Sequence, residues 1–307
     1  MSSSNGVISR RDMLSQGVRT TAGVFATAAL TSCSSLRRAR TGRSASQVRF
    51  GLTTYQWGKD WDLPKLIENC RKAGVFGTEL RTSQSYAHGV ELDIGAKQRQ
   101  DVKKSFRDSP VTLVGIATSE CFDSPDAEEL KTAIENTKGY IRLSHDTGGS
   151  GVRVFPNSFQ KDVPREKTIE QIGESLNTVG AFAADYGQQV RLEAHGSAGE
   201  LPTIKAIMDR VTEPSVRVKL NCDKRDNEGE GFEHNFNLVK DRLGSTIHGH
   251  DFKDPEYPYQ LMMDSLVKMG WGGWILLENS SSVPDRVAAL IEQRGIFDQM
   301  LRKSLVG

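Results

Sequence analysis

The stretch QVRLEAHGSAGELPTIKAIMDRVTEPSVRVKLNCD, residues 189–223, contains one complete unit of the pattern that decides the fold. Two short runs rich in valine and leucine, residues 189–194 and 216–221, are strand candidates, and the amphipathic segment 201–211 between them is a helix candidate. Glycine, proline and serine separate the three segments. A strand, a helix and a second strand in this order predict a parallel sheet.

The same alternation extends through the rest of the chain from residue 48. The other strand candidates are residues 49–55, 77–81, 111–118, 151–155, 246–250 and 274–278. The other helix candidates are residues 63–73, 127–145, 165–186, 236–243, 259–269 and 285–301. Eight strands are the number that a closed barrel needs, and no glycine-rich phosphate-binding motif of an open sheet follows the first strand. We therefore predict an α/β fold, a single-domain (β/α)8 TIM barrel, over residues 48–307.

The charge of the chain is unevenly distributed along it. The sequence has 40 Lys and Arg against 39 Asp and Glu, a formal charge of +1, but residues 1–46 hold seven arginines and a single acid, a net of +6. The remainder is therefore at −5, which argues against a nucleic-acid-binding body. Four scattered cysteines do not form a disulfide framework, and no apolar run approaches the ~20 residues of a membrane-spanning helix.

The basic amino-terminal segment has the features of a targeting signal. The paired arginines of SRRDML, residues 9–14, precede a weakly apolar stretch and resemble a twin-arginine export signal, and LTSC, residues 30–33, resembles a lipobox. We predict a signal peptide over residues 1–32 and a flexible basic linker over residues 33–47, on an exported, periplasmic protein. Cys33 would be the first mature residue and a possible lipid anchor, although small residues before it also suit ordinary signal peptidase.

Polar side chains gather at the carboxyl ends of several strand candidates. In VRLEAH the apolar residues alternate with Arg191, Glu193 and His195, so the polar set faces into the barrel. An unbroken apolar run before Glu278 leaves its direction open. The same alternation turns a further set inward, Glu79, Arg81, Arg153, Arg217, Lys219, Asn221 and Asp223, and it places His248 and His250 on one face of the seventh strand. Active sites of this fold lie at these strand ends, and so many buried charges must pair or bind a metal.

A single divalent ion is one way to satisfy these groups. Glu193 and Glu278, with one strand-six residue and one strand-seven histidine, could surround a common point. Mixed oxygen and nitrogen ligands suit Mn²⁺, Mg²⁺, Co²⁺ or Zn²⁺. The strand-six ligand could be Asp223 or Asn221, and the strand-seven ligand could be His248 or His250.

Four segments carry a resemblance to a known family. VRLEAHG (190–196), LNCD (220–223), IHGHD (247–251) and WILLEN (274–279), in this order, resemble the xylose isomerase-like TIM barrels, also called sugar phosphate isomerases/epimerases, over nearly the whole of the barrel. The resemblance implies metal ligands at Glu193, Asp223, a strand-seven histidine and Glu278. One departure stands out, since many members carry a substrate-contacting histidine where this chain has Asp226.

The resemblance also implies a chemistry. In epimerases of this family two glutamates act as acid and base on opposite faces of a sugar, and these would be Glu193 and Glu278 here. The expected enzyme is a metal-dependent sugar or polyol isomerase or epimerase that acts through an enediolate on an unphosphorylated small-molecule carbohydrate. A 3-keto-glycoside lyase and a non-catalytic sugar-binding barrel remain alternatives. Candidate substrate contacts are Glu79, Arg81, Arg153, His195, Lys219 and Asn221. Lys219 is expected to pair with Glu193 or Asp223.

Overall fold

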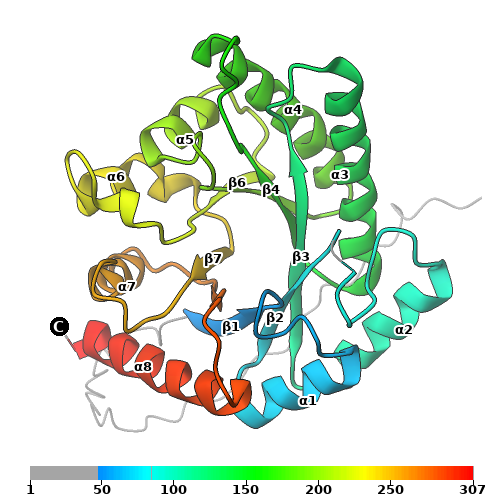
Figure 1. Ribbon diagram of the computed structural model, residues 1–307, viewed down its shortest axis with the longest axis vertical. Coiled ribbons are helices and arrows are strands. Elements are labelled where there is room, and N and C mark those ends of the chain that lie inside the picture. The colour runs from blue at the N-terminus through cyan, green and yellow to red at the C-terminus, as the bar shows by residue number, and fades with distance from the viewer. Residues whose placement is uncertain (1–47, 84, 307) are drawn as a thin grey trace, which may run out of the picture. The chain divides into compact units, whose positions relative to one another are not determined.

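The computed structural model describes residues 48–83 and 85–306, and these belong to one compact unit that spans Ala45–Gly307. Strands and helices alternate along this unit (Figure 1). The strands are β1 Arg49–Thr53, β2 Gly77–Arg81, β3 Thr112–Cys121, β4 Gly151–Phe155, β5 Gln189–Glu193, β6 Val216–Lys219, β7 Thr246–Gly249 and β8 Trp274–Leu277. The α-helices are α1 Leu63–Ala73, α2 Ala96–Arg107, α3 Ala127–Thr147, α4 Arg165–Asp185, α5 Leu201–Met208, α6 Phe232–Val239, α7 Tyr259–Lys268 and α8 Arg286–Val306.

The eight strands form one parallel sheet that is nearly closed on itself. Their order is β6-β5-β4-β3-β2-β1-β8-β7. The remaining seam, between β6 and β7, is bridged by two backbone hydrogen bonds, from Gly244 to Val218 (2.8 Å) and from His248 to Leu220 (2.9 Å). The helices lie around the outside of the strands (Figure 1). The predicted TIM barrel is confirmed.

Local sequence explains where the helices begin and end. At the start of α1, the Asp62 carboxylate accepts a hydrogen bond from the Lys65 amide (2.9 Å), and at its end Gly74 adopts φ 66°, the left-handed conformation that favours glycine. The structure adds α2, which was not among the helix candidates because only Val102 and Phe106 on it are buried. The helix expected at 236–243 instead begins at Phe232, and residues 240–242 form a 3-10 turn.

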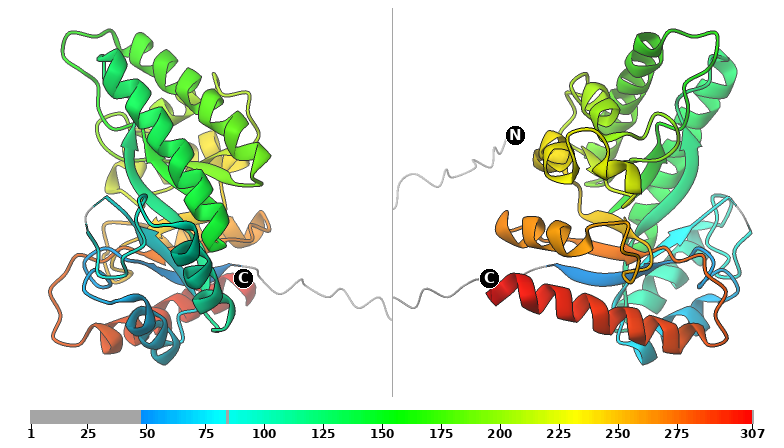
Figure 2. Two further views of the ribbon diagram at one scale, coloured as in Figure 1. Left: turned by 90° about the vertical axis from the view of Figure 1, so that its right-hand side faces the viewer. Right: turned by 60° about the vertical axis from the view of Figure 1, so that its left-hand side comes forward.

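Two apolar regions hold the barrel together. The large one lies between the sheet and the helices, and in Figure 2 the long helices α3 and α4 run side by side over it. The small one is inside the barrel and consists of Val114, Trp274 and Leu276. Trp274 fits there because a glycine, Gly77, faces its ring on β2, where any Cβ would collide with the ring. Since Trp274 and Leu276 point inward, the alternation of β8 also turns Glu278 inward.

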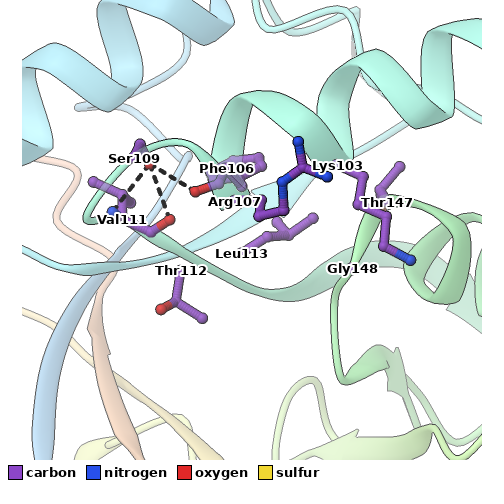
Figure 3. Close-up of a pocket in the computed structure, with 9 residues that line it drawn as sticks. All are labelled: Lys103, Phe106, Arg107, Ser109, Val111, Thr112, Leu113, Thr147 and Gly148. Atoms are coloured by element: carbon purple, nitrogen blue, oxygen red, sulfur yellow. Dashed lines mark hydrogen bonds between the residues drawn. The ribbon is translucent and has the colours of Figure 1, made fainter.

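A pocket of about 350 Å³ lies at the amino end of β3, below α2 (Figure 3). Lys103, Arg107, Leu113 and Thr147 help to line it. Its Ser109 hydroxyl is already hydrogen-bonded to neighbouring backbone carbonyls. Because this pocket lies at the amino end of β3, it is separate from the carboxyl ends of the strands where the polar side chains gather.

Among the described helices, none is both long and apolar enough to cross a membrane. The predicted signal peptide, the linker and Cys33 lie outside the described residues. The signal peptide, the linker and the lipid anchor therefore stay predictions from the sequence.

Candidate active site at the carboxyl end of the barrel

Three inward-facing side chains converge at the carboxyl ends of β5, β7 and β8. Glu193 is the last residue of β5, His248 is on β7, and Glu278 directly follows β8. His248 Nδ1 lies 3.0 Å from Glu193 Oε2 and 3.2 Å from Glu278 Oε2. The three donor atoms lie within 4.8 Å of one another, and all three residues are nearly excluded from solvent.

The arrangement suits a divalent cation. Glu193 Oε2 and His248 Nδ1 are buried and lie 3.0 Å apart, yet neither atom has a hydrogen-bond partner. Two ligands at right angles on one ion, each 2.0 to 2.3 Å from it, would lie about 3 Å apart. The observed separations match this, and two carboxylate oxygens with one imidazole nitrogen are an ordinary ligand set for such an ion. The residues present therefore fit a metal.

Two arginines hold the outer oxygens of the same glutamates. Arg153 on β4 contacts Glu193 Oε1 at 3.2 Å, and Arg81 on β2 contacts Glu278 Oε1 at 3.0 Å. Each guanidinium also stacks on an aromatic ring, at 3.9 Å for Arg153 over Phe155 and 4.5 Å for Arg81 over Tyr55. Because the outer oxygens are occupied, the inner oxygens of both carboxylates are turned toward His248. Arg81 and Arg153, predicted as possible substrate contacts, are thus placed as supports of the two glutamates.

A buried ion pair lies behind the imidazole of His248. Lys219 on β6 donates to Glu79 Oε2 on β2 (2.6 Å), and both side chains are completely buried. Burial alone would raise the pKa of Glu79, but the positive charge of Lys219 and the contact with His248 outweigh it and hold the pKa below its usual range. Lys219 also lies 3.6 Å from Glu193, so the expected pairing with Glu193 or Asp223 is confirmed through Glu193, while Asp223 pairs with Arg225.

The remaining strand-six and strand-seven candidates lie outside the group of three. The Asp223 carboxylate is bound by the Arg225 guanidinium at 2.8 and 3.0 Å, which lowers its pKa. His250 points its ring nitrogens at two backbone carbonyls, of Glu278 (3.0 Å) and Asn221 (2.7 Å). The structure thus brings His248, and not His250, to the two glutamates. The assignment of Asp223 as a ligand stays a prediction, and so does that of Asn221, whose Oδ1 is buried without a hydrogen bond.

The fold and the site agree with a family match. The xylose isomerase-like TIM barrel family matches residues 67–299. The chain belongs to this family. No curated protein matches the sequence.

Solved structures of the same fold include sugar epimerases. An L-ribulose 3-epimerase superimposes with a TM-score of 0.71 at 16% identity, over 84% of this chain and 95% of that chain. A 3-keto-D-glucoside 4-epimerase from E. coli gives 0.69 at 12% identity, over 83% of this chain and 99% of that chain. The IOLI protein, whose structure holds a zinc atom, gives 0.65 at 15% identity, over 84% and 99%. At such identities the likeness shows a shared fold.

Two further residues singled out by the sequence differ in their exposure. Asp226, the departure from the family pattern, is 3% exposed and accepts a hydrogen bond from the Tyr257 hydroxyl (3.2 Å). Burial raises the pKa of Asp226 to about 7. His195, by contrast, is exposed beyond the end of β5, with its ring 4.6 Å from that of Phe155. His195 is therefore placed at the rim, where a substrate could reach it.

The sequence did not identify the contact between Glu79 and His248. Glu79 Oε2 lies 2.7 Å from His248 Nε2, on the side of the ring opposite the two glutamates. Strand alternation placed Glu79 inside the barrel and His248 on one face with His250, but alternation gives no depth along the barrel axis. The sequence signal that could have revealed this contact was the pair of inward-facing charged residues, Lys219 and Glu79, each of which needed a partner.

Proposed function

We propose that this protein is a metal-dependent isomerase or epimerase of sugars or polyols, acting by proton abstraction next to a carbonyl through an enediolate. One observation carries the proposal. Glu193 and Glu278 present their inner oxygens on two sides of His248 Nδ1, while arginines fix their outer oxygens. Two buried carboxylates at one site could supply the acid and the base of a two-base proton transfer.

The related structures support this choice of reaction. Two of them are named as a ribulose 3-epimerase and a 3-keto-glucoside 4-epimerase, and a third holds a zinc atom. Both named reactions invert a carbon of a sugar. We infer that an unphosphorylated carbohydrate with a carbonyl group is the substrate class here.

Each residue of the site has a definite task in this scheme. Glu193, His248 and Glu278 would hold the ion. When bound, a divalent ion would polarise the carbonyl and the neighbouring hydroxyl of the sugar, which stabilises the enediolate. Glu193 and Glu278 then divide the proton transfer, one removing the proton from carbon and the other returning a proton to the opposite face. Arg81 and Arg153 keep both carboxylates oriented through the cycle.

Export belongs to the same proposal. We propose that residues 1–32 are a twin-arginine-type signal, that residues 33–47 are a linker, and that the barrel acts in the periplasm, with Cys33 as a possible lipid anchor. The paired arginines and the LTSC sequence support it. A fusion of residues 1–47 to a reporter that is active only after twin-arginine transport tests it. Substitution of Arg10 and Arg11 by lysine is expected to abolish transport, and unchanged transport would contradict the proposal.

The reaction is tested by hydrogen exchange from carbon. The metal-loaded protein is incubated in D₂O with a panel of free ketoses and 3-keto-glycosides, and deuterium incorporation is followed by NMR. We expect exchange at the carbon next to the carbonyl, together with the epimer or isomer. Release of an aglycone would show a lyase instead. Sugar binding by a metal-free protein with no exchange in the whole panel would support a binding barrel and overturn the proposal.

A matched control separates chemistry from general damage. Glu120, at the carboxyl end of β3, is a partly buried glutamate whose carboxylate contacts the Asn136 amide at 3.5 Å. It makes no contact with the group of three. Glu120→Gln is expected to keep the exchange rate of the wild-type protein.

A further inference from the structure

The two ring nitrogens of His248 have different surroundings. Nδ1 faces the inner oxygens of Glu193 and Glu278 and has no hydrogen bond. Nε2 faces the buried pair behind it, at 2.7 Å from Glu79 Oε2 and 2.6 Å from Lys219 Nζ. The pair comes from β2 and β6, far apart along the chain, and neither side chain has any exposed surface.

The partner of Nε2 decides which nitrogen can bind a metal. A neutral imidazole carries one proton, and only the nitrogen without it can be a ligand. If Nε2 keeps the ring proton and donates a hydrogen bond to Glu79, the lone pair of Nδ1 is free to face the two glutamates. If Nε2 instead accepted a hydrogen bond from Lys219, the ring proton would be on Nδ1, which then could not bind the ion. Glu79 and Lys219 therefore act on His248 in opposite senses.

The charges of the pair also act in opposite senses on a bound cation. Lys219 Nζ lies 3.6 Å from Glu193 Oε2, one of the candidate ligand oxygens, and so repels a cation there. Glu79 is a buried anion against the back of the imidazole, which makes the ring a better electron donor. Lys219 is nevertheless required by Glu79, because a completely buried carboxylate without a counter-ion is costly.

We propose that Glu79 is a positioning residue that fixes His248 as an Nδ1 ligand, and that Lys219 limits how tightly the site holds its ion. This inference rests on the proposed function only in taking Glu193, His248 and Glu278 as the metal site. The simpler reading, that Glu79 and Lys219 form an ion pair needed for folding alone, makes a different prediction. In that case, substitution of Glu79 and substitution of Lys219 would weaken metal binding to a similar extent, because both would damage the site in general.

The test measures metal affinity without any sugar. The full-length protein is stripped of metal, and dissociation constants for Mn²⁺, Co²⁺ and Zn²⁺ are measured by competition with a chelating dye. Glu79→Gln is expected to weaken binding about 10- to 100-fold, the usual cost of losing the carboxylate partner of a ligand histidine. Lys219→Met is expected to tighten binding, by about tenfold, because a positive charge near the ion is removed. Glu120→Gln serves as the control and is expected to bind like the wild-type protein.

Two further measurements keep the test decisive if Lys219→Met does not fold. The double variant Glu79→Gln/Lys219→Met buries no charge at either position, and its affinity is expected to lie between those of wild type and Glu79→Gln. Nitrogen-15 NMR of the histidine rings in the zinc-loaded wild-type protein is expected to show Nδ1 of His248 bound to metal and Nε2 protonated, with His248→Gln used to assign the signals.

The outcomes separate this inference from the proposed function. Equal weakening by both single variants, unchanged affinity in Glu79→Gln, or metal on Nε2 would overturn the role of Glu79 and Lys219 while leaving the epimerase proposal intact. A wild-type protein that binds none of the three ions would overturn both.

Discussion

Charged side chains are buried at both ends of the barrel interior, but the two ends differ in how these side chains are hydrogen-bonded. At the amino end, Arg191 is completely buried and donates to the Ser150 and Ser245 hydroxyls (2.7 and 3.0 Å) and to Gln189 (3.2 Å), so its hydrogen-bonding groups are satisfied by neutral oxygens. At the carboxyl end, ion pairs surround Glu193 and His248, yet each keeps an inner atom without a hydrogen bond. Unsatisfied carboxylate and imidazole atoms, rather than buried charge as such, mark the end that has a ligand to bind.

The largest expected effect is on the carboxyl end. Glu193→Gln and Glu278→Gln are each expected to lower the rate of carbon-bound hydrogen exchange by about 10² to 10⁴, because each removes one acid or base of the proton transfer. The measurement is the NMR exchange assay with the metal-loaded variants. A rate within about tenfold of wild type in either variant would mean that this glutamate does not move the proton.

Removal of the metal is the second way to test that end. Dialysis against a chelator is expected to reduce exchange to the background rate, since the enediolate then loses its main electrostatic stabilisation. Addition of Mn²⁺, Co²⁺, Mg²⁺ or Zn²⁺ should restore it, and the ranking of the ions identifies the preferred one. Full activity of a protein shown by elemental analysis to hold no metal would refute the metal dependence.

At the amino end the expected effect is on stability alone. Arg191→Met leaves buried hydroxyl and carbonyl oxygens without donors and is expected to lower the free energy of unfolding by about 3 to 5 kcal/mol. Metal affinity and exchange rate should stay at wild-type values in conditions where the variant is folded. Urea unfolding and the dye competition check both. A change in metal affinity would erase the distinction between the two ends.

Asp226 offers a smaller test, because it is a buried acid whose hydrogen-bond donor, Tyr257, is neutral. Its nearest charges are Asp223, which raises its pKa, and Arg225, which lowers it, and burial dominates. A pKa raised to about 7 in the folded protein, against about 4 when unfolded, means that the folded state keeps the proton longer, so stability falls as pH rises from about 4 to about 7.

Asp226→Asn should remove this loss. Between pH 5 and pH 8 the variant is expected to gain about 2 to 3 kcal/mol relative to wild type. Urea unfolding at the two pH values measures it. Parallel pH profiles for the two proteins would show that Asp226 is ionised in the folded state.

Much of the fold could be predicted from sequence. All eight strands were located, with ends within about three residues, because each strand is a short apolar run bounded by turn residues. The helix α2 was missed because its exposed face is charged and its buried face is only two residues wide. The direction of Glu278 could not be predicted from the apolar run WILL. It depends on Gly77, which leaves room for Trp274 inside the barrel.

The sequence predicted which residues could form the site, but it did not predict which of them contact one another. Alternation placed Glu193 and Lys219 inside the barrel, but it put His248 and His250 on the same face of their strand. The sequence therefore could not decide between them. It also could not show that Lys219 pairs mainly with Glu79, since β2 and β6 lie across the barrel from each other and no local spacing relates them.

The most direct test of the account is to locate the ion. Crystals of the full chain grown with Mn²⁺ would be measured at the absorption edge of manganese. The account predicts an anomalous peak bonded to Glu193, His248 Nδ1 and Glu278, and the same map would show whether Asp223 leaves Arg225 to join them. A peak elsewhere, or none at full manganese saturation of the solution, would contradict the assignment of the carboxyl end as the metal-binding active site.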